Sequence, residues 1–339
     1  MRIMVTGGAG FIGSNFIRWF LRRYPETDLI NIDLLTYAGN VANMKGFKAY
    51  SGYRFVHADI NDRRKLEPFF AEGLNAVINF AAESHVDRSI DAPVIFARTN
   101  IDGTLNLLSL AQRYGVKSFL QISTDEVYGT LGAEGLFTEE WPLAPNSPYA
   151  ASKAGADLLA LAFHTTYGLP VLITRCANNY GPYQFPEKLI PLVVINALRE
   201  EVIPVYGDGL QVRDWIHVED HCHAVERVLF HGRPGQVYNI GARGEKTNLE
   251  VIRAILQLVG KPESLIRFVA DRPGHDRRYG LAVDKIRSEI GWEAQIEFGE
   301  GLRQTVGWYL EHQPWWQGIL SGEYKDFYQR NYGFRLEGN

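Results

Sequence analysis

The chain has 339 residues, a net charge of −4 and a hydrophobic share of 46%. That length allows about two domains of ~150 residues, each with a core of its own. The slightly acidic balance gives no basic patch for nucleic acid, and no apolar run approaches the ~18 residues of a membrane span. The two cysteines, Cys176 and Cys222, form no CxxC motif, so the sequence predicts a reduced, cytoplasmic compartment without disulfides.

Short apolar runs alternate with longer amphipathic stretches through the first half of the chain. Strands are expected at 2–7, 28–33, 53–59, 76–81, 117–123 and 170–175, with a further strand at 236–242. Helices are expected between them, at 13–23, 62–72, 94–114 and 149–167. Nearly continuous apolar strands separated by helices are typical of a parallel sheet that is covered on both faces.

The second half has a different character, with frequent prolines and glycines in 181–215 and 271–274. Helices are expected there at 187–200, 248–259 and 299–311. We expect one domain from residues 1–180 plus about 216–242, and a smaller α+β domain from 181–215 plus about 243–339. Because the chain returns to the first sheet near 236–242, the two domains are interleaved rather than joined by one linker.

A glycine-rich turn, GGAGFIG at 7–13, follows the first strand directly and opens a helix. Gly8, Gly10 and Gly13 fit G-x-G-x-x-G, and Gly7 gives a looser GxxGxxG with the last two. Glycines permit a tight turn, and they let backbone N–H groups approach a pyrophosphate at the helix N-terminus. The strand–turn–helix context favours a dinucleotide site over a plain glycine turn. The sequence thus predicts an α/β fold with a Rossmann-type doubly wound parallel sheet.

Asp33 ends the second strand, 33 − 13 = 20 residues after the last glycine of the turn. A carboxylate at this place binds the adenosine ribose hydroxyls and repels a 2′-phosphate, so it favours NAD over NADP. Asp59 closes the third strand and is expected near the adenine. The alternative for either residue is an ordinary strand-end turn.

Two groups of reactive side chains follow the glycine turn. STDEVYG at 123–129 sets Thr124, Asp125 and Glu126 at the end of an apolar strand, where the acids are either turn residues or an acid–base pair. Tyr149 and Lys153 share one face of a predicted helix at i, i+4. A lysine there is expected to lower the pKa of the phenol, which can then remove a hydroxyl proton.

Together these motifs resemble the extended short-chain dehydrogenase/reductase family. The resemblance rests on GGAGFIG, Asp33, the Ser123–Thr124 pair and Tyr149 with Lys153. Within that family, the Thr-Asp-Glu run is similar to that of the nucleotide-sugar 4,6-dehydratases, whereas epimerases carry small or hydroxyl residues in place of the acids. Further similar segments, from LTYAGN at 35–40 to DRPGHDRRY at 271–279, extend across the smaller domain. One departure is Ala177, where a serine is usual.

The resemblance implies an NAD-dependent hydro-lyase that acts on dTDP-glucose in deoxysugar synthesis of the dTDP-rhamnose type. Tyr149 would take the O4 proton while hydride leaves C4, and Thr124 would hydrogen-bond the same oxygen. Glu126 would remove the C5 proton, and Asp125 would protonate the leaving C6 hydroxyl. Hydride would then return to C6, so that the cofactor is regenerated in each cycle.

The resemblance also implies two sets of binding residues. For the cofactor they are Gly7, Gly10, Phe11, Ile12, Gly13, Asp33, Leu35, Thr36, Asp59, Ile60, Ala81, Ala82, Thr99, Tyr149, Lys153 and Asn179. For the substrate they are Ser84, His85, Arg88, Thr124, Asn178, Lys188, Leu189, Pro204, Tyr206, Arg213, Asn248, Arg272, His275 and Tyr279. An anionic diphosphate requires cationic or N–H donors, which the arginines, the lysine and the histidines supply.

Three alternatives and two smaller expectations complete the prediction. The alternatives are a 4-epimerase, a dehydratase acting on a UDP- or CDP-sugar, and a non-catalytic dinucleotide sensor on the same scaffold. The run HVEDHCH at 217–223 fits no zinc signature, so no metal is expected. Apolar residues on more than one face of the helices at 94–114 and 149–167 predict a homodimer through a helix bundle.

Overall fold

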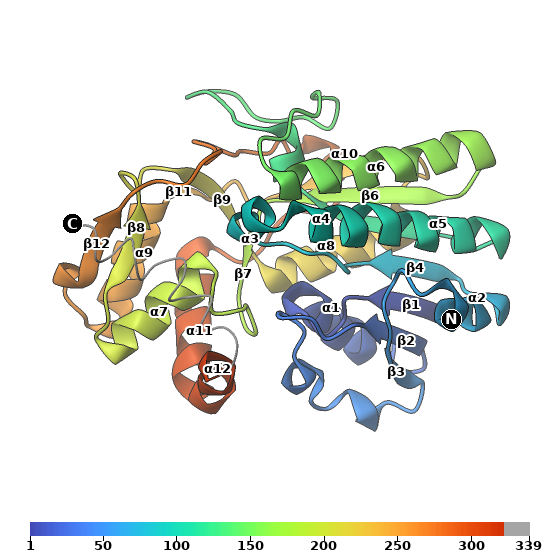
Figure 1. Ribbon diagram of the computed structural model, residues 1–339, viewed down its shortest axis with the longest axis horizontal. Helices are drawn as coiled ribbons and strands as arrows, with labels where there is room; N and C mark the ends of the chain where they lie inside the picture. The colour runs from blue at the N-terminus through green and yellow to red at the C-terminus, as the bar shows by residue number, and fades with distance from the viewer. Residues whose placement is uncertain (322–339) are drawn as a thin grey trace.

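The computed structural model describes residues 1–321 and contains a seven-stranded parallel sheet (Figure 1). Its spatial order is β10-β6-β5-β4-β1-β2-β3. The strands are β1 (Arg2–Thr6), β2 (Asp28–Asp33), β3 (Tyr53–His57), β4 (Ala76–Asn79), β5 (Phe119–Thr124), β6 (Val171–Cys176) and β10 (Val237–Ile240). All neighbours in this sheet run parallel, so the predicted doubly wound α/β fold is confirmed.

Helices cover both faces of this sheet, so most of its strands are buried, whereas β3 at the edge is only partly buried. Ile3 and Val5 of β1 face a core that includes Phe16 and Val225, whereas Met4 faces a second core that includes Leu107. The helices on the first face are α1 (Phe11–Arg23), α8 (Val218–His231) and α10 (Asp284–Ile290); those on the second are α2 (Arg63–Ala71), α5 (Thr104–Arg113) and α6 (Pro148–Tyr167). No helix among the described residues is long and apolar enough to span a membrane.

The helix predicted over 94–114 is divided into three parts. α4 (Pro93–Phe96) leads into a π-helical segment, η3 (Ala97–Gly103), which continues into α5. In η3 the Asn100 side chain donates hydrogen bonds to the Glu83 carbonyl and to Ser152 Oγ, at 3.0 and 2.8 Å. π-Helical turns occur often at functional sites, and this one ties the loop after β4 to α6.

A smaller unit lies beside the carboxyl ends of the large sheet, on the left of Figure 1. It contains two small sheets, one of β7 (Asn178–Tyr180), β9 (Val212–His217) and β11 (Glu245–Thr247), the other of β8 (Ile203–Tyr206) and β12 (Ile266–Val269). Its helices are α7 (Leu189–Arg199), α9 (Asn248–Val259), α11 (Phe298–Glu311) and α12 (Gln313–Leu320). Val193, Ile255 and Leu302 pack together in a core of its own.

The chain passes between the two units more often than the sequence suggested. After β9 it returns to the large sheet through α8 and β10. It returns again after β12, because α10 contacts both β10 and α8 and places Ile286 and Ile290 in the core of the large unit. The range predicted for the smaller domain, about 243–339, did not include this second return, and its residues 322–339 lie outside the described part of the chain.

Candidate active site

A cleft lies at the carboxyl ends of the parallel strands, facing the smaller unit. Ligands of open α/β sheets bind at this edge. The cleft is lined by the catalytic candidates and by every predicted cofactor residue except Leu35. Four of the predicted substrate residues also line it: Ser84, Thr124, Asn178 and Lys188. The structure thus brings together side chains from both halves of the sequence.

The glycine turn between β1 and α1 is packed too tightly for larger residues. Gly7 has a φ of 72°, and a Cβ there would lie 2.6 Å from the Ala81 backbone nitrogen. A Cβ on Gly13 would lie 2.3 Å from the Gly7 carbonyl oxygen. Gly10, the N-cap of α1, supplies no side-chain cap for the first-turn N–H groups of the helix. The turn and the helix N-terminus therefore suit an anionic diphosphate.

Asp33 is held at the tip of β2 by two backbone N–H donors. Its Oδ2 accepts a hydrogen bond from Ala9 N at 2.8 Å, and its Oδ1 accepts one from Leu35 N at 2.7 Å. Burial raises the pKa of this carboxyl, and the two N–H groups counteract part of the rise. Each carboxylate oxygen can accept a further hydrogen bond. The acid next to the glycine turn fits a dinucleotide whose ribose hydroxyls are free, as in NAD.

The Thr124–Asp125–Glu126 run begins where β5 passes into a 3₁₀ turn, η4 (Asp125–Tyr128). Thr124 caps this turn: its Oγ1 accepts a hydrogen bond from Glu126 N at 3.3 Å and donates one to Asp125 Oδ1 at 3.2 Å. Asp125 is 2% exposed, and among the described residues its Oδ2 has no hydrogen-bond partner. The two carboxyl groups are therefore neighbours in a poorly solvated site.

Burial and nearby charges shift the pKa values of the Asp125 and Glu126 carboxyls. Burial and the neighbouring Glu126 carboxylate raise the pKa of Asp125 well above its usual range. Burial also raises the pKa of Glu126, but the positive charges of Arg272 and Arg213 oppose that rise. Neighbouring carboxyls in different environments can hold opposite protonation states. Because Arg213 also opposes the rise at Asp125, the two carboxyls share part of their surroundings and titrate as a coupled pair.

Tyr149 and Lys153 lie on the first turns of α6, whose N-cap Ser147 accepts a hydrogen bond from Ala150 N. Both side chains are buried, and Lys153 Nζ donates to the Ile122 carbonyl at 2.6 Å. Burial and the Glu126 carboxylate raise the pKa of Tyr149 well above its usual range. The expected lowering of this pKa is thus wrong for the protein's own groups, because burial and the nearby carboxylates raise it.

Of the predicted cationic groups of the smaller unit, Lys188 lines the cleft, whereas Arg213 and Arg272 act electrostatically on Glu126 from outside its lining. The Arg213 guanidinium lies 4.3 Å from the centre of the Tyr279 ring and donates to the Asp276 carbonyl at 2.9 Å. Tyr279 donates its hydroxyl hydrogen to Asp276 Oδ2. Arg278, six residues after Arg272, is paired with Glu245.

Most of the other predicted substrate residues do not line the cleft. Lys188 Nζ donates to the Ser84 carbonyl at 3.1 Å, and Arg88 pairs with Glu187 at 3.4 Å. His85 is buried at the N-cap of α3 (Val86–Asp91), and burial lowers its pKa well below the usual range. The remaining positions are at element boundaries or in strands: Leu189 begins α7, Asn248 begins α9, Pro204 lies in β8, and His275 pairs with Asp271.

Some residues of the cleft were not predicted. Cys176 and Glu187 both line it. Asn179 Nδ2 lies 3.4 Å from Cys176 Sγ, and Asn179 Oδ1 lies 2.8 Å from His221 Nδ1. His221, one of the histidines of the run HVEDHCH, is therefore a buried side chain that is hydrogen-bonded within the protein. Glu187 directly precedes the predicted Lys188, and that adjacency was the only sequence signal for it.

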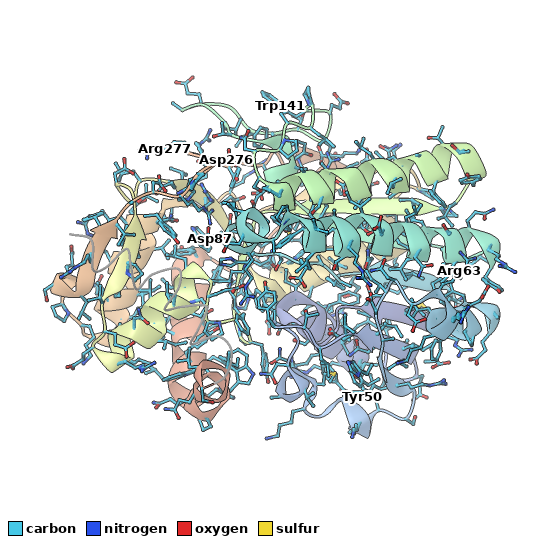
Figure 2. All side chains as sticks on the ribbon, viewed as in Figure 1. Tyr50, Arg63, Asp87, Trp141, Asp276 and Arg277 are labelled. Atoms are coloured by element: carbon cyan, nitrogen blue, oxygen red, sulfur yellow. The ribbon has the colours of Figure 1, made fainter. Side chains whose placement is uncertain are left out.

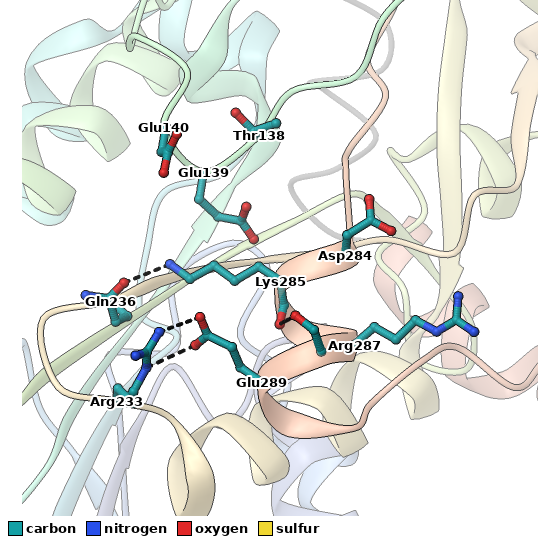
Figure 3. A pocket seen from close by; sticks show the side chains of 10 residues that line it. Thr138, Glu139, Glu140, Arg233, Gln236, Asp284, Lys285, Arg287 and Glu289 are labelled. Carbon is teal, nitrogen blue, oxygen red and sulfur yellow. Dashed lines mark hydrogen bonds and ion pairs between the residues drawn. The ribbon is translucent and has the colours of Figure 1, made fainter.

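A second hollow lies away from these residues, between β10, α10 and the loop at 138–140 (Figure 3). Most of its charged side chains are engaged with groups in or beside the hollow. Arg233 binds Glu289 through two hydrogen bonds, and Lys285 Nζ donates to Gln236 at 2.9 Å. None of the predicted site residues lies there, so the chemistry is assigned to the cleft.

Comparisons with known proteins agree with this assignment. The family model described as GDP-mannose 4,6 dehydratase matches residues 4–305. A dTDP-glucose 4,6-dehydratase of Xanthomonas campestris pv. campestris is 51% identical over 341 residues, covering 95% of this chain and 97% of that protein. The structure of DesIV, a dTDP-glucose 4,6-dehydratase from Streptomyces venezuelae with NAD and TYD bound, is 51% identical, with a TM-score of 0.91 over 94% of this chain and 100% of that one.

A more distant structure shares the fold but has another activity. The UDP-glucose 4-epimerase of Thermus thermophilus in complex with NAD is 32% identical, with a TM-score of 0.85 over 92% of this chain and 100% of that one. The sequence identity to this epimerase is 51 − 32 = 19 percentage points lower than the identity to DesIV. The chain belongs to the dTDP-glucose 4,6-dehydratase family of NAD-dependent hydro-lyases.

Proposed function

We propose that this protein converts dTDP-glucose into dTDP-4-dehydro-6-deoxyglucose by eliminating water across C5 and C6. The observation that carries the proposal is the pair Asp125–Glu126, two adjacent carboxyls with raised pKa values beside Tyr149. Elimination needs an acid and a base in opposite protonation states. A 4-epimerase has no step at C5 or C6 that would use them.

Each side chain has one role in this proposal. Bound NAD supplies the hydride acceptor for C4 and the hydride donor for C6. Tyr149 takes the O4 proton, while Thr124 Oγ1 hydrogen-bonds the same oxygen. The resulting 4-keto group acidifies the C5 hydrogen, which Glu126 removes. Asp125 gives its proton to the C6 hydroxyl, which leaves as water, and C5 later regains a proton.

In this proposal the two interleaved units have different binding roles. Residues 1–180 with about 216–242 bind NAD and carry the catalytic groups, and the remaining segments supply most of the nucleotide-sugar site. Arg213, Arg272 and Lys188 all exert their positive charge on Glu126, which supports a substrate site that is continuous with the catalytic residues. Charge-assisted hydrogen bonds from such groups suit a diphosphate. His275, Tyr206 and Asn248 complete this set.

A homodimer through a helix bundle is part of the proposal. Apolar side chains are exposed on α4 and α6, among them Val94 at 76%, Ile95 at 53% and Leu158 at 58%. Exposed apolar residues gathered on neighbouring helices favour association with an identical surface. α4 and α6 contact each other within one chain, so two copies would form a bundle of four helical segments.

We place the protein in the cytoplasm, in a deoxysugar pathway of the dTDP-rhamnose type. Both cysteines are buried as free thiols, which is typical of a reducing compartment. The proposed product, a 4-keto-6-deoxy sugar still attached to its nucleotide, is a precursor for further modification of the ring.

One assay tests the proposed reaction. The purified protein is incubated with dTDP-glucose, and a 4-keto sugar is detected by the absorbance that it develops in alkali. UDP-glucose is the parallel substrate. We expect signal with dTDP-glucose; signal with UDP-glucose alone would reject the nucleotide, and a change at C4 without the keto product would indicate an epimerase.

A further inference from the structure

An aspartate outside the predicted site connects the two units across the cleft. Asp87 lies on α3, in the large unit, and its side chain is almost completely buried (Figure 2). Its Oδ1 is 3.2 Å from Arg272 Nη1, and its Oδ2 accepts a hydrogen bond from the Tyr206 hydroxyl at 3.1 Å. Both partners belong to the smaller unit, so one carboxylate fixes two of its side chains.

The next residue of α3 makes the complementary connection. Arg88 pairs with the buried Glu187 at 3.4 Å, so consecutive residues of opposite charge reach two separate segments of the smaller unit. Contacts of this kind align the two units where they meet. The Asp87 contact differs in that Arg272 and Tyr206 are both proposed to bind the nucleotide sugar.

Arg272 retains donor capacity for a second anion. Its Nε is buried, and it has no hydrogen-bond partner among residues 1–321. Its guanidinium also lies 6.0 Å from the centre of the Tyr206 ring, so the two side chains are neighbours as well as sharing Asp87. A planar guanidinium that is held on one edge by a carboxylate can present its other donors to a phosphate.

We propose that Asp87 is a positioning residue for substrate recognition: its carboxylate holds Arg272 and Tyr206 ready for the anionic diphosphate of the nucleotide. This inference rests on the proposed function, since it assumes a nucleoside diphosphate sugar in the cleft. Asp87 does not itself touch the substrate; it would act by orienting two groups before the ligand arrives. Prior orientation lowers the cost of ordering flexible side chains on binding.

The test is the affinity for dTDP, the nucleotide without the sugar, measured by calorimetry on the NAD-loaded protein. Asp87→Asn keeps the shape and removes the charge, and we expect dTDP binding to weaken by about ten- to a hundredfold. KM should rise by a similar factor while kcat changes much less, since no reacting atom is affected. Asp87→Glu, which keeps the charge, should recover part of the affinity.

A matched control is the ion pair between Asp208 and Arg277, at 2.8 Å, in which both side chains are more than half exposed. Asp208→Asn removes the carboxylate that pairs with Arg277, an arginine on the same segment as Arg272. The variant therefore measures the effect of losing an exposed ion pair near the site. We expect its affinity for dTDP to match that of the unmodified protein. An Asp87→Asn protein that binds dTDP equally well would overturn the inference.

Two further outcomes are separable. If Asp87→Asn does not fold, Tyr206→Phe carries the test, because it removes only the hydroxyl that donates to Asp87; unchanged dTDP affinity in that variant rejects the inference. If the unmodified protein does not bind dTDP at all, the proposed function fails and this inference fails with it. Normal dTDP binding by both the unmodified protein and the Asp87 variant rejects only the role of Asp87.

Discussion

The Lys153 ammonium donates a hydrogen bond to the Ile122 carbonyl at 2.6 Å, which fixes the position of the lysine at the end of β5. Ile122 lies two residues before Thr124, so this bond ties the catalytic helix α6 to the strand that carries the acids. Burial lowers the pKa of Lys153, whereas the neighbouring Asp157 carboxylate raises it. The lysine side chain is thus held at a defined place beside the strand that carries the acids.

Replacing this lysine should therefore impair proton transfer at Tyr149. Lys153→Met preserves much of the side-chain volume but removes the charge and the bond to Ile122. We expect kcat to fall by about 10²- to 10⁴-fold, the usual contribution of general acid–base catalysis. Steady-state kinetics with dTDP-glucose measure this effect, and an unchanged kcat would show that Tyr149 does not depend on Lys153.

Removing either acid should separate oxidation from elimination. In Glu126→Gln the C5 proton has no base, and in Asp125→Asn the C6 hydroxyl has no acid. We expect product formation to fall by about 10²- to 10⁴-fold in each variant. Oxidation at C4 should persist in part, so reduced nicotinamide should accumulate and be visible by its absorbance. Full-rate formation of the 4-keto-6-deoxy product by both variants would refute these assignments.

Much of this site could be predicted because its signals are local in sequence. The glycine turn and the Tyr149–Lys153 pair each occupy a few consecutive residues, and most strands of the large sheet are short buried runs. Asp87 and Arg272 are 185 positions apart in the sequence, and Arg88 and Glu187 are 99 positions apart. No local sequence pattern predicts contacts over such separations.

The short strands of the smaller unit were missed for a related reason. β7 and β11 have three residues each, and β8 and β12 have four. Runs of that length show no clear alternation of apolar and polar residues. Their pairing is fixed by contacts with segments far away in the chain, such as β12 with β8, rather than by their own composition.

Burial of Asp125 should make the protein less stable as the pH rises. Its pKa is raised in the folded state, so the folded protein binds this proton more strongly than the unfolded chain, whose aspartates titrate near about 3.9. The stabilising contribution is complete below that value and is lost as the pH rises through the folded-state pKa. Asp125→Asn should therefore have a higher Tm than the unmodified protein at neutral pH.

The same comparison at acidic pH supplies the control. The difference in Tm between the Asp125→Asn protein and the unmodified protein should shrink as the pH falls toward the unfolded-state pKa, where both side chains are neutral. Differential scanning calorimetry across this pH range measures the difference. A gap that stays constant with pH would mean that the carboxyl of Asp125 is not strained by burial.

Two glycine substitutions should affect different properties, one the affinity for NAD and the other the stability of a helix. Gly13→Ala places a methyl group 2.3 Å from the Gly7 carbonyl oxygen, so the dinucleotide turn must shift, and we expect NAD affinity to fall at least about tenfold. Gly307 lies inside α11, where a Cβ meets nothing within 4 Å. Gly307→Ala should stabilise the helix by up to about 1 kcal/mol and leave NAD binding unchanged.

The proposed dimer can be tested with a pair of exposed leucines. Leu158 on α6 is 58% exposed and lies on the proposed bundle, whereas Leu258 on α9 is 41% exposed and lies on the smaller unit. Leu158→Glu would place a charge at the centre of an apolar contact and should dissociate the dimer, because an unpaired charge is costly to bury. Leu258→Glu should have no such effect. Sedimentation velocity distinguishes the two, and a Leu158→Glu protein with the mass of a dimer would place the interface elsewhere.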